Sequence, residues 1–111
     1  MTGKDANIRA AAAITSDGRV IAAELQAGVD PDRFAAMSAS LLALAERGVA
    51  ETRRGRLRQL LIEGTEGAIL LVQAGDHAVL AVSTDPGALI GKVFIEARSS
   101  ADKLRACLDV G

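Results

Sequence analysis

Aromatic residues and cysteine are nearly absent from this chain of 111 residues. Phe34 and Phe94 are its only aromatic residues, and it has no Trp or Tyr. A base-stacking platform for nucleic acid or an aromatic cage for a ligand is hard to build from two phenylalanines. Cys107 is the only cysteine, which excludes an internal disulfide framework. A reduced cytosol suits this composition best, so we expect a cytoplasmic protein.

Long hydrophobic runs and an excess of charge of one sign are also missing. The apolar stretches are far shorter than the roughly 20 residues that cross a bilayer, and residues 1–9 are polar with mixed charge, unlike a secretory leader. The net charge of −1 gives no general attraction to nucleic acid or to an anionic membrane. We therefore expect neither a nucleic acid partner nor membrane insertion.

The composition that remains is that of a small globular protein. Half of the residues are apolar, and the length suits one domain whose core needs no metal or disulfide. No repeat, low-complexity tract or linker divides the chain. We expect a short polar N-terminal segment at residues 1–9 and a single domain at residues 10–111.

Seven elements follow from the apolar patterns and from the turn signals between them. Asp17-Gly18 and Gly75-Asp76 each separate two apolar runs, which is typical of hairpins. Short connections of this kind require antiparallel neighbours. The expected strands are 10–15, 20–25, 57–63, 68–73 and 77–83, and the expected helices are 31–54 and 89–108.

The first helix has clear start and end signals. Asp30 is suited to accept backbone N–H bonds as the N-cap, and Pro31 fits the first helical position. Arg53 and Arg54 in the last turn suit the helix dipole, and Gly55 suits the position just after the helix.

Small side chains occupy sides of this helix where a solvated face would usually have charge. Phe34, Met37, Leu41 and Leu44 follow one another at helical spacing. The small residues are Ala35, Ala36, Ala39, Ser40 and Ala43. A helix that is small or apolar nearly all round favours partners on more than one side. We expect one side to cover the sheet and another to contact a second chain.

The order ββαβββα predicts an α/β protein of the α+β type, with a five-stranded antiparallel sheet covered by two helices. This order resembles the roadblock/dynein light chain family, which has a profilin-like fold. The likeness rests on the hairpin at residues 13–22, the Ala- and Met-rich helix at 34–42 and the helix entry at 88–97. Together it spans about residues 10 to 108.

The resemblance implies a homodimer in which the long helices pack antiparallel and the third strands pair into one sheet. The family includes bacterial and archaeal regulators of Ras-like GTPases, so it also implies a non-enzymatic partner of a small GTPase, without a cofactor. The candidate residues for the dimer or partner interface are Ala36, Met37, Ser40, Ala43, Arg47, Arg58, Leu60 and Ile62.

The sequence offers only weak candidates for a nucleotide-binding, catalytic or metal site. The segment 87–93 differs from a phosphate-binding P-loop, because three residues separate its glycines and Val93 follows the Lys. His77 is the only histidine, and nothing in the sequence places it with Ser83 as a catalytic pair. One His and one Cys are too few for a zinc site. We interpret Cys107 as a small semi-buried side chain.

Four arginines between residues 53 and 58 form the only dense basic run. A contact with phosphate or with an acidic surface is one interpretation. Because glutamates lie close by in the sequence, we interpret the run as a solvated surface.

Two other function classes stay open. A pure dimerisation or scaffold module would have stable partners but no effect on GTP hydrolysis. A sensor related to profilin-like or PAS folds would hold a small ligand, and the scarcity of aromatic residues argues against it. An enzyme is the least expected class.

Overall fold

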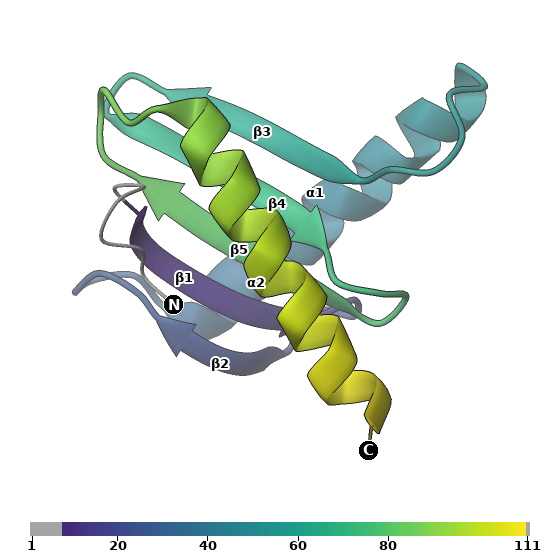
Figure 1. The fold of residues 1–111 in the computed structure, drawn as a ribbon, viewed down its shortest axis with the longest axis horizontal. Helices are drawn as coiled ribbons and strands as arrows, with labels where there is room; N and C mark the ends of the chain where they lie inside the picture. Colours follow the sequence, from purple (N-terminus) through teal and green to yellow (C-terminus); the bar gives the residue numbers. More distant parts are fainter. Residues whose placement is uncertain (1–7, 111) are drawn as a thin grey trace.

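The structure, a computed structural model, describes residues 8–110, which form five strands and two helices in the order ββαβββα (Figure 1). The strands are β1 Ile8–Thr15, β2 Val20–Glu24, β3 Gln59–Gly64, β4 Gly67–Gln73 and β5 Ala78–Thr84, and the helices are α1 Pro31–Glu51 and α2 Ile90–Val110. The predicted element order is confirmed. Most of the polar segment predicted at residues 1–9 lies outside the described residues, and β1 begins two residues before its predicted start.

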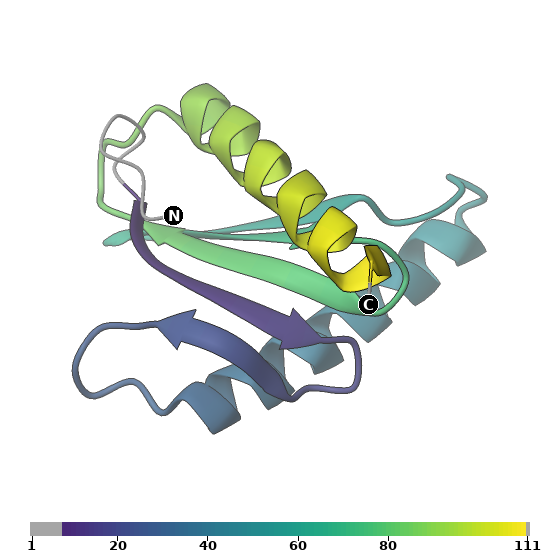
Figure 2. The ribbon, with the colours of Figure 1, turned by 60° about the horizontal axis from the view of Figure 1, so that its bottom comes forward.

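The five strands form one antiparallel sheet in the order β2-β1-β5-β4-β3. The pairing of β1 with β5, in which Ala13 lies opposite Leu80, joins the first hairpin to the later three strands. β2 and β3 are consequently the two edges of the sheet (Figure 2).

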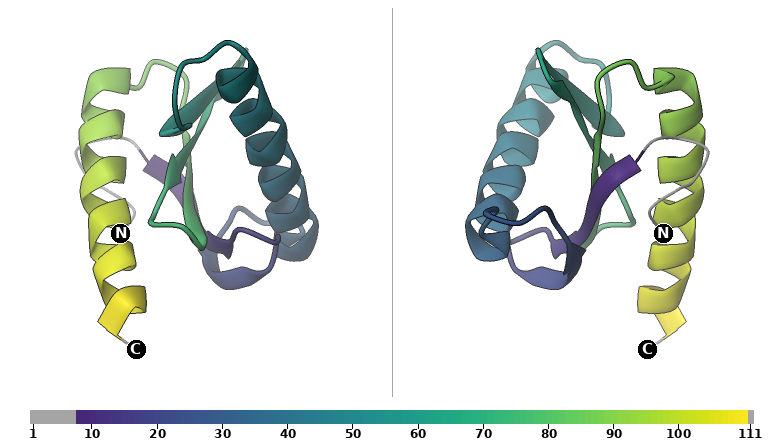
Figure 3. Two further views of the ribbon diagram at one scale, coloured as in Figure 1. Left: turned by 90° about the vertical axis from the view of Figure 1, so that its right-hand side faces the viewer. Right: turned by 90° about the vertical axis from the view of Figure 1, so that its left-hand side faces the viewer.

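The two helices cover opposite faces of this sheet (Figure 3). α2 packs on β4 and β5, whereas α1 packs mainly on β1 and β2. Because alternate side chains of a strand point to opposite faces, each face has its own core. Leu80 and Val93 belong to the core under α2, and Ile14, Leu42 and Leu71 belong to the core under α1. The face of β3 on the α1 side therefore lies beside the helix and not beneath it.

α1 starts as the sequence predicts. Asp30 is the N-cap, and its Oδ1 accepts a hydrogen bond from the Asp32 N–H at 3.1 Å. The β1–β2 turn lies close against the helix: a Cβ on Gly18, where φ is +92°, would come within 3.3 Å of the Ala36 Cα. Glycine at this turn thus lets the first hairpin approach α1 closely.

The predicted end of α1 at Arg54 was wrong, since the helix ends at Glu51. The Thr52 hydroxyl bonds the Gly48 carbonyl at 2.8 Å, and the Arg54 N–H bonds back to the Val49 carbonyl at 2.8 Å. Arg53 adopts a left-handed φ of 57°. This pattern is a Schellman motif, which reverses the chain before Gly55 is reached.

Neither helix within residues 8–110 has the length and apolarity that a bilayer crossing requires.

Candidate functional site

One face of α1 exposes large apolar side chains. Met37, Leu41 and Leu44 are 49%, 36% and 66% exposed. The residues that α1 buries against the sheet are mostly small: Ala35, Ser38 and Leu42. A surface helix normally turns its largest apolar side chains toward the core. The reversed distribution in α1 favours a contact between this face and another protein surface.

β3 continues the apolar character at the edge of the sheet. Leu60 packs on the α1 side of the sheet, and Ile62 faces the same side. Both stay only half-buried, and Leu61 on the other side is 36% exposed. Among the described strands only β4 pairs with β3, so the outer edge of β3 is unpaired there. An apolar edge strand without Pro or Lys is a ready template for another strand.

We call the exposed side of α1 together with the α1 side of β3 the α1–β3 surface. Its residues are Ala36, Met37, Ser40, Leu41, Ala43, Leu44 and Arg47 of α1, and Leu60 and Ile62 of β3. Seven of the eight predicted interface residues lie on it, and Arg58 lies just before β3. Leu41 and Leu44 also lie on it but are not among the predicted residues, because helical spacing alone does not show which side of α1 faces the sheet.

A cleft of about 650 Å³ adjoins this surface and shares Ala43 with it, at the end of the sheet near the β4–β5 turn. Its walls come from the second half of α1, from residues 56–59, from the β4–β5 turn and from the middle of α2. Leu42, Leu57, Val72 and Val79 contribute apolar lining. The arginines that line it are Arg56, Arg58, Arg98 and Arg105.

Two of these arginines have carboxylate neighbours. Arg56 Nε lies 4.0 Å from Glu46 Oε1, and Arg105 Nη2 lies 3.8 Å from Asp102 Oδ1. The Arg56 and Arg105 side chains are 81% and 54% exposed, and ion pairs of this kind contribute roughly 0–1 kcal/mol. They therefore hold the two guanidinium groups only loosely.

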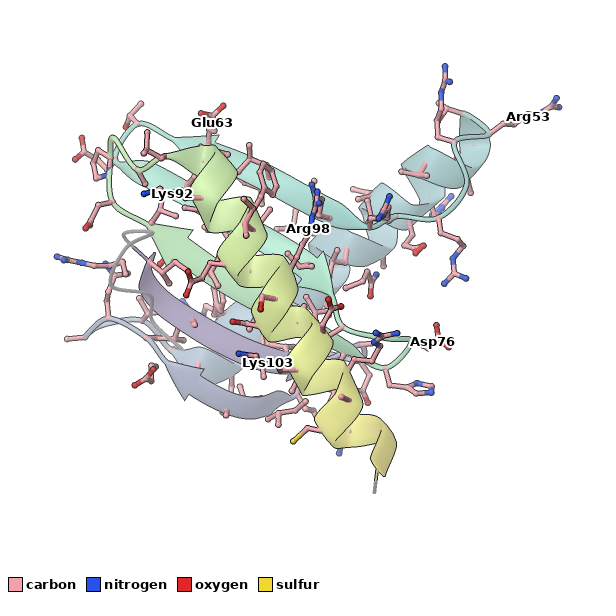
Figure 4. The ribbon with its side chains drawn as sticks, in the orientation of Figure 1. Arg53, Glu63, Asp76, Lys92, Arg98 and Lys103 are labelled. Atoms are coloured by element: carbon pink, nitrogen blue, oxygen red, sulfur yellow. The ribbon has the colours of Figure 1, made fainter. Side chains whose placement is uncertain are left out.

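Arg98 is positioned by contacts that are not ionic. Its Nε donates a hydrogen bond to Gln59 Oε1 at 3.0 Å, and its guanidinium carbon lies 5.8 Å from the centroid of the Phe94 ring. These contacts connect α2 to the edge strand β3 and fix the guanidinium group on the cleft side of α2 (Figure 4).

The residues considered for catalysis do not come together. His77 precedes β5 and Ser83 lies near its end, so about 20 Å of strand separates them. The Ser83 hydroxyl is buried and has no hydrogen-bond partner among the described residues. Within residues 8–110 no three His, Cys, Asp or Glu side chains gather as ligands for a metal ion.

The β1–β2 turn beside the cleft is organised by its own side chains. The Thr15 hydroxyl donates to the Asp17 carboxylate, and this bond lowers the pKa of Asp17 below its usual value. Arg19 Nε, 3.6 Å from Asp17 Oδ2, acts in the same direction. Ser16 Oγ donates to the main-chain oxygen of Asp76 at 3.2 Å, which connects this turn to the β4–β5 turn. The Asp17 carboxylate thus interacts with Thr15 and Arg19 of its own turn.

The two remaining motifs have structural explanations. Gly91 and Lys92 belong to the first turn of α2, and the Lys92 N–H bonds the Leu89 carbonyl at 3.0 Å. Segment 87–93 is therefore the entry into α2. Cys107, interpreted from the sequence as semi-buried, is exposed near the end of α2.

Comparisons with known proteins place this geometry in a family. Residues 2–84 match the model of the Roadblock/LC7 domain. The uncharacterized protein MJ0310 of Methanocaldococcus jannaschii is 37% identical over 103 residues, which are 93% of this chain and 90% of that protein. MJ1340 of the same organism is 36% identical over the same shares of the two chains.

Solved structures share the fold at lower identity. Myxococcus xanthus MglB superimposes with a TM-score of 0.90 at 20% identity, covering 97% of this chain and 89% of that one. The gliding protein MglB from Thermus thermophilus gives a TM-score of 0.86 at 20% identity, over 97% and 83% of the two chains. From the family match, the sequence relatives and the ββαβββα fold, we conclude that this chain belongs to the Roadblock/LC7 domain family.

Proposed function

We propose that this protein is a non-enzymatic homodimer that acts in the cytoplasm as a regulatory or scaffolding partner of a Ras-like small GTPase. The observation that carries the proposal is the α1–β3 surface, where large apolar side chains of α1 are exposed beside an unpaired apolar strand. The GTPase part is supported by the resemblance to a family that includes bacterial and archaeal regulators of such enzymes.

The symmetry of homodimers and the size of the α1 side chains support the dimer. α1 is about 31 Å long, and Ser40 and Ala43 near its middle permit the close approach of a second helix. In an antiparallel pair the same patch contacts itself, so each copy covers Met37, Leu41 and Leu44 of the other. Full burial of one such side chain is worth roughly 1.5–3 kcal/mol. The β3 edges of the two copies can then pair.

Ala43→Glu tests the dimer. The substitution places one carboxylate per copy near the symmetry axis, where the two charges would lose water and repel each other. We expect the solution mass, measured by light scattering, to fall from twice 11.4 kDa to that of a single chain. Ala106→Glu is the matched control, because Ala106 is an exposed alanine on α2. A mass that Ala43→Glu leaves unchanged would refute this interface.

The action on a GTPase requires a separate assay. Without catalytic residues of its own, a regulator acts by favouring one state of the partner's switch loops. We expect a Ras-like GTPase encoded beside this protein to bind it and to hydrolyse GTP faster in its presence. Binding with unchanged hydrolysis would favour the scaffold alternative. No binding and no stimulation would contradict the GTPase proposal.

A further inference from the structure

Positive charge gathers at the end of the molecule where α1 finishes and the cleft opens. Seven of the thirteen basic residues lie there, against four carboxylates, although the chain as a whole has a net charge of −1. The basic residues are Arg47, Arg53, Arg54, Arg56, Arg58, Arg98 and Arg105, and the acidic ones are Glu46, Glu51, Asp76 and Asp102. This group of residues therefore carries a net positive charge.

Two arginines of the cleft are available to a ligand. No carboxylate within residues 8–108 forms an ion pair with Arg58 or Arg98. Arg98 is already held by Gln59 and Phe94, so a ligand that binds it immobilises little additional side chain. A guanidinium group presents its donors as a planar fork, which matches the two oxygens of a carboxylate.

The lining of the cleft also includes apolar side chains. Leu42 and Val79 are almost fully buried, and Leu57 is half-buried in the segment that precedes β3. Leu57 is therefore the large apolar side chain of this lining that a ligand can reach. A ligand that fits both features has carboxylates separated by apolar groups.

A nucleic acid or another dense array of phosphates fits this cleft less well. Glu46, Asp76 and Asp102 line the same space and would repel closely spaced phosphates. The only aromatic ring near the cleft, Phe94, lies beneath the Arg98 guanidinium and leaves no surface for base stacking. Carboxylates on a peptide are farther apart and can avoid the three acidic side chains.

We propose that this cleft binds an acidic segment of a partner protein, in which glutamate or aspartate side chains alternate with apolar ones. Arg58 and Arg98 bind the carboxylates, and Leu57 contacts the apolar side chains. The proposal goes beyond the dimer and the GTPase, since it assigns a second recognition surface at the end of α1, which meets the α1–β3 surface at Ala43.

The test uses the full chain and a defined probe. A synthetic eight-residue peptide of alternating glutamate and leucine is titrated into the ¹⁵N-labelled protein, and amide chemical shifts are followed by NMR. We expect shifts confined to the residues that line the cleft and an affinity that falls as salt is raised. The same peptide with glutamine in place of glutamate, and a short single-stranded DNA, should bind at least tenfold more weakly.

Charge-reversal variants assign the contact to the two arginines. Arg58→Glu and Arg98→Glu should each weaken peptide binding at least tenfold. Lys103→Glu is the matched control, because Lys103 lies on the opposite side of α2 from Arg98 and changes charge by the same amount (Figure 4). It should alter the affinity less than twofold. Arg58→Glu is the decisive variant, because Arg58 is exposed and lies outside the sheet and helices.

Three results would overturn the proposal: equal loss of binding in Lys103→Glu, equal binding of the glutamine or DNA probe, or a solution mass halved by Arg58→Glu without peptide. The last result would mean that the cleft is part of the contact between copies. The peptide titration contains no GTPase. A failed titration therefore leaves the proposed GTPase function standing, and a failed GTPase assay leaves the cleft proposal standing.

Discussion

Gly67 has the tightest surroundings of the glycines that the structure describes. Its φ is +134°, and a Cβ at this position would lie 2.2 Å from the Thr84 main-chain oxygen. Thr84 is itself fixed, since its buried Oγ1 accepts a hydrogen bond from the Ala68 N–H at 3.2 Å. Any side chain at Gly67 must therefore displace the backbone that joins the β3–β4 turn to the end of β5.

Gly67→Ala should lower the free energy of unfolding by about 2–4 kcal/mol, because it adds a steric clash to a backbone conformation that only glycine adopts easily. Urea denaturation at one fixed protein concentration measures the change. Gly48→Ala is the matched control, since Gly48 is helical and nothing lies within 4 Å of its added Cβ. That variant should raise the same free energy by about 0.5–1 kcal/mol. Equal effects of the two variants would contradict this account.

Among the elements, α1 ends in an unusual way, since an arginine occupies the left-handed position of its C-terminal motif. Arg53→Gly should relieve that strain and raise the free energy of unfolding by about 1 kcal/mol, which corresponds to a few degrees in Tm. Thermal denaturation followed by circular dichroism measures it.

Arg54→Gly is the control for this prediction. It removes the same charge from a neighbouring residue whose φ is not positive. It should leave Tm unchanged or lower it. If Arg54→Gly stabilised the protein as much as Arg53→Gly, loss of charge and not backbone strain would be the cause.

The elements were predictable wherever their signals are local. The Asp30 cap, Pro31 and the hairpin at Asp17-Gly18 act through neighbouring residues, so the sequence predicts the elements and their order correctly. The end of α1 was mispredicted because Gly55 fits the usual pattern, whereas the Thr52 hydroxyl and Arg53 terminate the helix earlier.

The candidate site was less predictable because it depends on contacts between distant segments. Which side of α1 meets the sheet depends on the position of α1 over β1 and β2, so Leu41 and Leu44 were missed. The cleft combines side chains from α1, the 56–59 segment, the β4–β5 turn and α2. The basic run is visible in the sequence, but the approach of Arg98 to Gln59 depends on how α2 crosses the sheet.

For the molecule as a whole, amide hydrogen exchange can show whether β3 is an edge or an interior strand. In an antiparallel edge strand every second N–H points to solvent. If β3 of two copies pair, consecutive amides of Gln59–Gly64 should all exchange slowly. In Ala43→Glu, alternate amides should become fast. Alternating protection in the unaltered protein would show that the helices associate without the strands.

Among residues 8–110 the sheet has two free edges of different character, and this difference limits the shape of an assembly. Pairing at β3 joins identical edges and leaves a β2 at each outer end of the joined sheet. A second pairing at β2 would repeat without limit and produce a fibre instead of a closed particle. β2 is only five residues long, ends in an exposed Glu24 and packs against α1, and short charged edges resist such growth. Replacing Glu24 with an apolar residue would remove a barrier between a discrete dimer and polymer.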